Sequence, residues 1–289
     1  MYPSNQIEVL RLVTRQNLNE YRKQTSCEHL KKAERSLYAA VKYLVKEKKK
    51  AFVIQTPGGF IRYCSPLIQY SSGISSNPKD YDSITIDCNR HVSKILSRSL
   101  LAGLRKVTDY LTLGIDIKDR VDPDNGPHVE LVATYDVKAA KFISWTGKSS
   151  PVSEQKNNLI YCNDWGSHFQ KWRNKNVLIL GCHDLNIFSP RSRKLVKQGT
   201  YKYKLSKYFN NKSKRYNPDI VLHHPHNTDC TKTWSTGWVG VMRAYPKLQT
   251  YSSGINYYNG DGKRNKLEDV LKATAKGRVN YFIVKKSPK

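Results

Sequence analysis

The sequence has no long apolar run, no closely spaced cysteines and comparatively few acidic residues. No stretch of its 289 residues approaches the roughly 18 to 20 apolar residues that a membrane-spanning helix needs, and no apolar segment of signal-peptide type stands near the start. The six cysteines are scattered without a Cys-x-x-Cys pair, which argues against a disulfide framework and against a zinc site built from cysteines. We therefore expect a cytoplasmic protein with no membrane partner.

The shortage of acidic residues leaves the chain strongly basic. Its 50 Lys and Arg residues against 23 Asp and Glu residues give a formal net charge of +27. Such a charge favours a polyanionic partner such as DNA or RNA, although a solvated basic surface explains it equally well. The aromatic and basic run over 201–215 is the first candidate for such a contact. Hydrophobic residues make up 38% of the chain, so we expect a sizeable core rather than disorder.

Apolar periodicity predicts alternating helices and strands. Apolar residues at helical spacing predict helices over 26–48, with Ser26 as N-cap, and over 91–107. Residues 5–24 give weak signals that favour helix or mixed structure. Short apolar runs predict strands at 51–56, 84–87, 110–117, 129–135, 141–146, 177–180, 219–222, 248–252 and 279–284. The alternation indicates parallel β–α units and therefore an α/β fold.

Polar residues gather directly after several of the predicted strands, at the sheet edge where ligands bind in parallel α/β proteins. Cys182 follows Gly181 after one strand. A thiol on such a tight turn becomes a nucleophile when a helix N-terminus or a nearby cation lowers its pKa. The simpler alternative is a buried structural thiol.

The histidines after the next strand allow a different chemistry. His223, His224 and His226, together with Asp184 or Asp229, have the side chains that bind zinc or manganese. Such a site would make the chain a metal-dependent nuclease or phosphoesterase. The same histidines could instead pack and form hydrogen bonds at the strand end.

A third candidate set consists of carboxylates. Asp116, Glu130 and Asp184 lie on or near predicted strands, as in nucleases that hold two metal ions. The order and spacing beyond Asp184 fit that arrangement poorly. We therefore predict no bound metal and no cofactor.

Taken in order, the segments resemble the nitrilase superfamily of carbon–nitrogen hydrolases. The first helix leads into a strand that ends at Pro57, and a later strand leads to Lys148. A further strand runs into a turn that carries Cys182, and the last shared helix contains Trp234. The resemblance spans residues 26–256 and rests on the shared order of motifs that are each weak.

This resemblance implies a fold and an assembly. The family fold is an α-β-β-α sandwich, which we expect as a single domain over 26–289 after an N-terminal segment, 1–25. The resemblance also implies a homo-oligomer, at least a dimer.

The resemblance further implies the chemistry of the site. In the family a carboxylate takes the proton of a thiol, the thiolate attacks an amide or nitrile carbon, and a Lys ammonium stabilises the negative charge that develops. By position, Cys182 corresponds to the nucleophile and Lys148 to the oxyanion stabiliser. The residues that we expect to contact a small amide-like substrate are His183, Asp184, His224 and Trp234.

One member of the family's Glu-Lys-Cys triad is missing. The family has a glutamate directly after Pro57, whereas this chain has Gly58, and no Glu occurs between Glu47 and Glu130. Without a base, a thiol near its free pKa of about 8.5 is mostly protonated at neutral pH. The candidate substitutes are Glu154, Glu130, His183 and His224. If none of them acts, the chain is an inactive nitrilase-like protein that binds nucleic acid or a protein partner through its basic surface.

Overall fold

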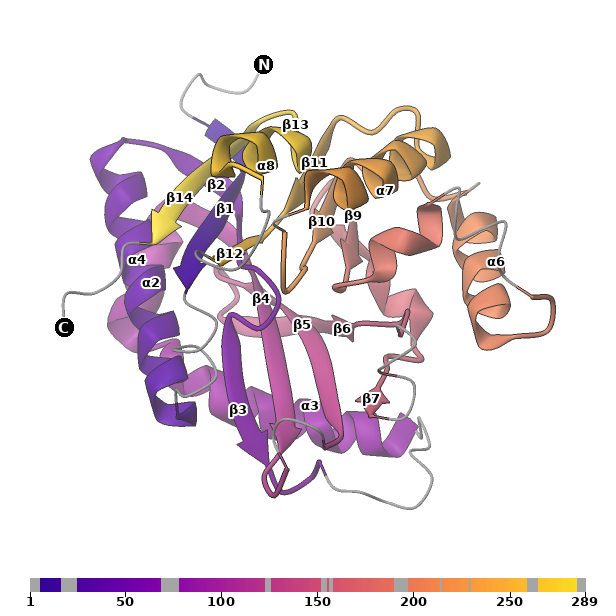
Figure 1. Ribbon diagram of the computed structural model, residues 1–289. Helices are drawn as coiled ribbons and strands as arrows, with labels where there is room; N and C mark the ends of the chain where they lie inside the picture. The colour runs from indigo at the N-terminus through magenta and orange to yellow at the C-terminus, as the bar shows by residue number, and fades with distance from the viewer. Residues whose placement is uncertain are drawn as a thin grey trace.

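The chain folds into two β-sheets that stack face to face, with helices on both outer sides (Figure 1). The computed structural model describes residues 6–16, 25–68, 78–122, 126–151, 155, 158–189, 197–213, 215–228, 230–258 and 265–284. None of the described helices is long and apolar enough to cross a membrane.

The larger sheet has nine strands within the described residues, six of them in the order β12-β1-β2-β4-β5-β6. The pairs β1–β2 and β2–β4 are parallel, whereas β4–β5 and β5–β6 are antiparallel. Three further strands lie outside this order and pair with its members, β3 with β4, β7 with β5 and β14 with β1. The strands are β1 (Gln6–Gln16), β2 (Lys50–Gln55), β3 (Ile61–Ser65), β4 (Thr108–Asp119), β5 (His128–Asp136), β6 (Lys141–Gly147), β7 (Leu159–Ile160), β12 (Ile255–Tyr258) and β14 (Val279–Val284).

The smaller sheet has the order β13-β11-β10-β9-β8. Its three central strands are parallel, so their carboxyl ends lie side by side at one edge. The strands are β8 (Phe169–Trp172), β9 (Lys175–Leu180), β10 (Ile220–His223), β11 (Thr250–Ser253) and β13 (Ala275–Lys276).

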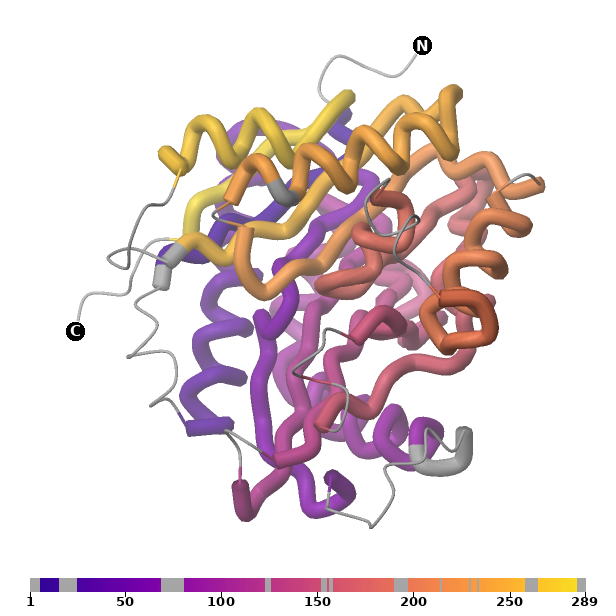
Figure 2. The backbone as a smooth tube through the Cα atoms, turned by 45° about the vertical axis from the view of Figure 1, so that its right-hand side comes forward, coloured from indigo at the N-terminus to yellow at the C-terminus, as the bar shows by residue number. Residues whose placement is uncertain are grey.

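Helices cover the outer faces of the two sheets. Figure 2 shows α2, in indigo and purple, and α6, in orange, on opposite sides of the molecule. The α-helices are α2 (Ser26–Lys46), α3 (Pro78–Val92), α4 (Arg98–Val107), α6 (Tyr201–Ser213), α7 (Thr231–Ala244) and α8 (Leu267–Ala273), and the 3-10 helices are η1 (Ser93–Ile95), η3 (Trp165–His168) and η4 (Asp184–Phe188).

Neighbouring residues of one strand show the layers, because successive side chains of a strand point to opposite faces. In β2, Ile54 packs in the same buried cluster as Leu37 of α2, whereas Val53 packs against Ile179 of the smaller sheet. In β9, Leu178 faces the other way and packs with α6 and α7. Each sheet is therefore buried on both faces, and the predicted α-β-β-α sandwich is confirmed.

The first predicted helix is confirmed as α2. Its N-cap is Thr25, one residue before the predicted Ser26, and Thr25 forms a capping box with Glu28. The buried face includes Leu37 and Leu44, which recur at helical spacing. The helix ends at Lys46 and is followed by Lys48 with φ of 52°.

Strand β1 differs most from the expectation for 5–24, where helix or mixed structure is predicted. The strand is buried in the sheet although it carries charged residues in its interior. Arg11 donates a 2.8 Å hydrogen bond to Thr274 Oγ1, and Glu8 pairs with Lys175 at 2.6 Å. These partners come from distant parts of the chain. The charged residues of β1 therefore interrupt the apolar pattern by which a strand is predicted from sequence.

The strand predicted at 84–87 is wrong, because this segment lies inside α3. Ile84, Cys88 and Val92 are buried four residues apart, which is a helical stripe. The helix predicted over 91–107 is confirmed in its second part as α4. A short 3-10 turn, η1, separates α4 from α3.

The basic run over 201–215 forms helix α6 in its described part. Leu205 and Phe209 are buried against the smaller sheet, while Lys204 and Lys207 are exposed. The apolar face of this helix therefore covers the sheet, and its basic face is turned to solvent. The binding of a polyanion by this face stays a prediction.

Candidate active site

Cys182 lies on a tight turn between β9 and η4. The turn begins with Gly181, where an added Cβ would lie 2.8 Å from the main-chain nitrogen of Lys148. Only glycine allows the end of β9 to approach the residue after β6 this closely. The turn holds Cys182 almost buried, with 5% of its surface exposed.

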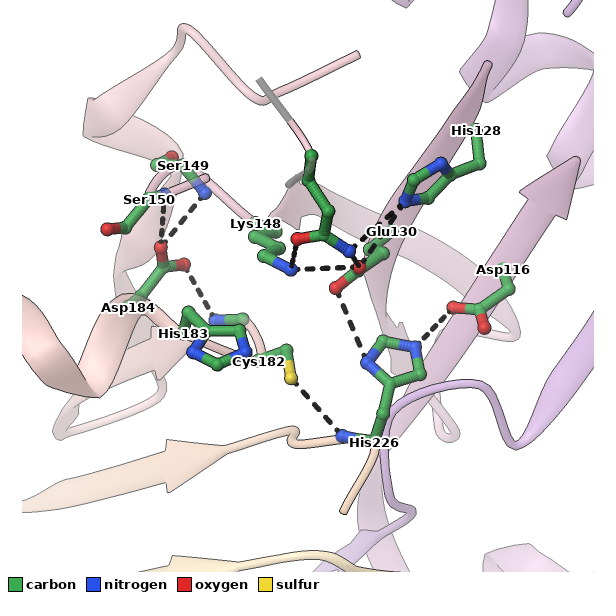
Figure 3. A network of polar contacts seen from close by, with 12 residues as sticks. Asp116, His128, Glu130, Lys148, Ser149, Ser150, Cys182, His183, Asp184 and His226 are labelled. Atoms are coloured by element: carbon green, nitrogen blue, oxygen red, sulfur yellow. Dashed lines mark hydrogen bonds and ion pairs between the residues drawn. The ribbon is translucent and has the colours of Figure 1, made fainter. Parts of the chain in front are cut away.

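The carboxylate of Asp184 holds this turn in place. Its Oδ2 accepts a 2.9 Å hydrogen bond from the N–H of Gly181. Its Oδ1 accepts hydrogen bonds from the N–H groups of Ser149 and Ser150, at 2.9 and 2.7 Å (Figure 3). Asp184 is fully buried and joins the turn that carries Cys182 to the segment after β6. Both of its oxygens, predicted to meet substrate, accept main-chain hydrogen bonds.

Lys148 and Glu130 form a buried ion pair. Lys148 Nζ donates to Glu130 Oε1 at 3.0 Å and also to the side-chain oxygen of Gln155. Burial opposes the charge on Lys148, but the carboxylate of Glu130, and then the thiolate of Cys182, raise the pKa of Lys148 above its ordinary value. Burial likewise opposes the charge on Glu130, but His226 and Lys148 hold the pKa of Glu130 well below its ordinary value. Both groups are therefore charged at neutral pH.

His226, in the segment after β10, lies between two carboxylates. Its Nε2 is 2.6 Å from Asp116 Oδ1, and its Nδ1 is 3.3 Å from Glu130 Oε2. Burial favours the neutral ring, but Asp116 and then Glu130 raise the pKa of His226 well above its ordinary value. The ring is therefore an imidazolium at neutral pH.

The sulfur of Cys182 lies beside this imidazolium. A ring nitrogen of His226, an oxygen of Glu130 and Cys182 Sγ all lie within 4.8 Å of one another. The main-chain N–H of His226 also donates to Cys182 Sγ at 3.4 Å. Burial alone would raise the pKa of the Cys182 thiol, but the charge of His226 and a contact with His183 lower that pKa to about 6. At neutral pH the sulfur is therefore mostly a thiolate.

The two preceding histidines are in the opposite state. Burial lowers the pKa of His223 to about 3 and that of His224 to about 3, so both rings are neutral. His223 Nε2 is 2.7 Å from the carbonyl oxygen of Cys182, and its Nδ1 is 3.1 Å from Ser253 Oγ. Trp234, predicted to contact substrate, is buried in the core with its ring centroid 4.9 Å from that of His223. The structure thus places His223 and Trp234 in the buried packing beneath the turn that carries Cys182.

The described members of the predicted set of metal ligands, which are His223, His224, His226 and Asp184, do not converge. Among the residues that the structure describes, the metal-ligating side chains that do converge are those of Glu130, Cys182 and His226. Their sulfur, nitrogen and oxygen atoms are donors that zinc accepts. Glu154 and Asp229 lie outside the described residues.

Three of the predicted catalytic residues meet at one place. Cys182, Lys148 and Glu130 face a common space from three different strand ends (Figure 3). His226 completes this group, although the sequence indicated it only as a metal ligand. The sequence likewise indicates Asp116, the partner of His226, only as a metal-binding carboxylate. The cluster of histidines at the end of β10 is the one local signal that points to His226.

Comparisons with known proteins identify the fold. No protein-family model and no curated protein matches the chain. A solved structure of a cysteine-to-alanine mutant of the Nesterenkonia AN1 amidase from the nitrilase superfamily is 13% identical, covering 91% of this chain and 80% of that chain with a TM-score of 0.51. Another structure of an amidase from Nesterenkonia sp. is 12% identical, covering 90% and 79% with a TM-score of 0.49. At such low identity the likeness shows the fold alone, and this chain has the fold of the nitrilase superfamily.

Proposed function

We propose that the chain is a cysteine-dependent hydrolase of amide-type carbon–nitrogen bonds. The observation that carries this proposal is the state of Cys182. Its thiol is almost buried, yet its pKa is lowered to about 6 beside an imidazolium. A thiolate is the nucleophilic form of cysteine, and a structural core thiol has no need of such surroundings. The nitrilase-superfamily fold, shared with an amidase, supports the same reaction class.

Lys148 supplies the second part of the chemistry. Its ammonium lies near enough to Cys182 for the thiolate to raise its pKa, and Figure 3 shows Nζ and Sγ turned toward the same space. When the thiolate bonds to an amide carbon, negative charge develops on the amide oxygen. A buried ammonium stabilises that charge strongly because water does not screen it. Loss of the amine then leaves a thioester, which water hydrolyses to the acid.

A covalent assay tests this function without knowledge of the natural substrate. We expect p-nitrophenyl acetate to acylate Cys182 with a burst of p-nitrophenol, and short aliphatic amides to release ammonia. In Cys182→Ala both signals fall by on the order of 10³-fold or more, because the nucleophile is gone. Cys27→Ala is the matched control, because this thiol is exposed and distant in sequence from the turn. A folded wild-type protein whose Cys182 takes no acetyl group would sink the proposal and favour an inactive nucleic-acid or protein-binding chain.

A further inference from the structure

The position of the missing glutamate is filled by another part of the chain. An added Cβ on Gly58 would lie 2.6 Å from the carbonyl oxygen of His224 and 3.2 Å from Cε1 of His226. The segment after β10 therefore occupies the volume into which a side chain at position 58 would extend. The same segment is tied to Gly58 by a 3.1 Å hydrogen bond from the Gly58 N–H to the carbonyl oxygen of Pro225. A side chain at position 58 and the His226 ring in its present position therefore compete for the same space.

The His226 ring is held in an orientation suited to proton transfer. Asp116 accepts a hydrogen bond from Nε2 at 2.6 Å, and Glu130 Oε2 lies 3.3 Å from Nδ1, so two carboxylates fix the ring with Nδ1 on the side of the sulfur (Figure 3). The 3.4 Å contact between the His226 N–H and Cys182 Sγ fixes the backbone on that side as well. A carboxylate, an imidazole and a thiol in this order form the arrangement that activates nucleophiles in hydrolases of other folds.

The other candidate bases are less suited to this role. Glu130 is engaged by Lys148 at 3.0 Å and by Gln155 at 3.2 Å, and its pKa lies well below the ordinary range, which makes it a weak base. Both ring nitrogens of His223 are bonded to Ser253 and to the carbonyl oxygen of Cys182 rather than to its sulfur. The ring nitrogens of His226 are also paired, but with the carboxylates of Asp116 at 2.6 Å and Glu130 at 3.3 Å, and one of these nitrogens lies within 4.8 Å of the sulfur.

We propose that His226, oriented by Asp116, is the general base and acid for Cys182 and replaces the glutamate that nitrilase-like proteins carry after Pro57. This assignment rests on the proposed function. At neutral pH the proton of Sγ already lies on the His226 ring, so the thiolate bonds directly to the amide carbon. The imidazolium then gives this proton to the departing amine as the C–N bond breaks. In the second half, His226 takes a proton from water, the hydroxide bonds to the thioester carbon, and the C–S bond breaks to release the acid and restore the thiolate beside the imidazolium.

The test measures the protonation of Cys182 directly. Alkylation by iodoacetamide is followed by peptide mass spectrometry from pH 4.5 to about 9.5, a range that brackets the free thiol value of about 8.5. In the wild-type protein we expect half-maximal labelling of Cys182 near pH 6, where its pKa lies. In His226→Gln the midpoint moves to about 8.5 or above, and labelling at pH 7 falls roughly 30-fold. The exposed thiols of Cys27 and Cys230 label alike in both proteins and serve as internal standards.

Further variants make the result specific. In His226→Ala, added imidazole has room to enter and should restore acylation by p-nitrophenyl acetate, which a merely structural role would not allow. Glu130→Gln should leave the labelling midpoint closer to the wild-type value than His226→Gln does. The assignment of His226 is overturned if Glu130→Gln moves the midpoint and His226→Gln does not. It is also overturned if the protein holds zinc whose removal by EDTA speeds the labelling of Cys182, because Cys182 and His226 would then be metal ligands.

These outcomes separate the two proposals. A wild-type protein that acylates Cys182, with a pH profile unaffected by His226→Gln, keeps the hydrolase function and rejects His226 as its base. A wild-type protein that labels with a midpoint near pH 6 but forms no acyl-enzyme keeps the thiolate–imidazolium pair and rejects the hydrolase function.

Discussion

Two strand-end segments meet at the sulfur of Cys182, and they contribute in different ways. The segment after β9 is tied together by main-chain hydrogen bonds, with Asp184 fully buried and both of its oxygens occupied. Strand β10 ends with the neutral ring of His223, and the segment after it carries the charged ring of His226 three residues later. The first segment fixes where the sulfur lies, and the second fixes its charge.

The difference between the two neighbouring histidines shows what sets that charge. His223 is fully buried and His226 partly buried, and burial favours the neutral form of each ring. His223 finds only a carbonyl and a hydroxyl oxygen, so its pKa falls to about 3. His226 finds two carboxylates, and their charges outweigh burial. Position next to a carboxylate, rather than position in the sequence cluster, decides which histidine can serve the thiol.

The largest effect should come from Asp184→Ala, which breaks the first segment. The substitution leaves three main-chain N–H groups without their acceptor, at Gly181, Ser149 and Ser150. Each buried unpaired donor costs about 1–3 kcal/mol, so we expect the free energy of unfolding in urea to fall by about 3 kcal/mol or more. Asp164→Ala is the control, because this exposed aspartate also accepts two main-chain N–H bonds, at the start of η3. The loss of such a helix cap should lower the free energy of unfolding by only about 1 kcal/mol. Equal losses in the two variants would contradict the structural role of Asp184.

The next largest effect should come from Gly58→Ala, which should displace the segment after β10. The added methyl group would meet the His224 carbonyl oxygen at 2.6 Å, a backbone atom that moves only with its loop. A shift of about 1 Å in His226 should lower the rate of Cys182 acylation by on the order of 10²-fold. The control is Gly103→Ala in α4, where the new methyl group meets only the side chain of Val41 at 3.0 Å. Wild-type acylation in a folded Gly58→Ala protein would show that the loop does not position the base.

These contacts also explain how much the sequence could predict. The helices, the central strands and the turn that carries Cys182 are set by local patterns. Asp184, for example, binds the N–H of a residue three positions away. The partnership of His226 with Asp116 joins residues 110 positions apart, and no spacing rule brings them together. The strand predicted at 84–87 is wrong for a related reason. A run of four residues fits both the strand period and the helix period, and only the buried stripe of α3 shows that the segment is helical.

The smallest effect should come from Asp116→Asn, which separates orientation from charge within the second segment. The amide oxygen keeps an acceptor for His226 Nε2, but the charge that does most to raise the pKa of His226 is lost. That pKa then falls toward its ordinary value, the thiolate of Cys182 loses part of its stabilisation, and the labelling midpoint of Cys182 rises above pH 6. We expect acylation at pH 7 to fall roughly 3- to 10-fold, which corresponds to about 0.7–1.4 kcal/mol and to one weakened hydrogen bond. Asp109→Asn on the same strand is the control, because its ion pair with Arg173 is partly exposed and contributes little. A midpoint that stays at pH 6 in Asp116→Asn would assign the charge of His226 to Glu130 and leave Asp116 only the task of orienting the ring.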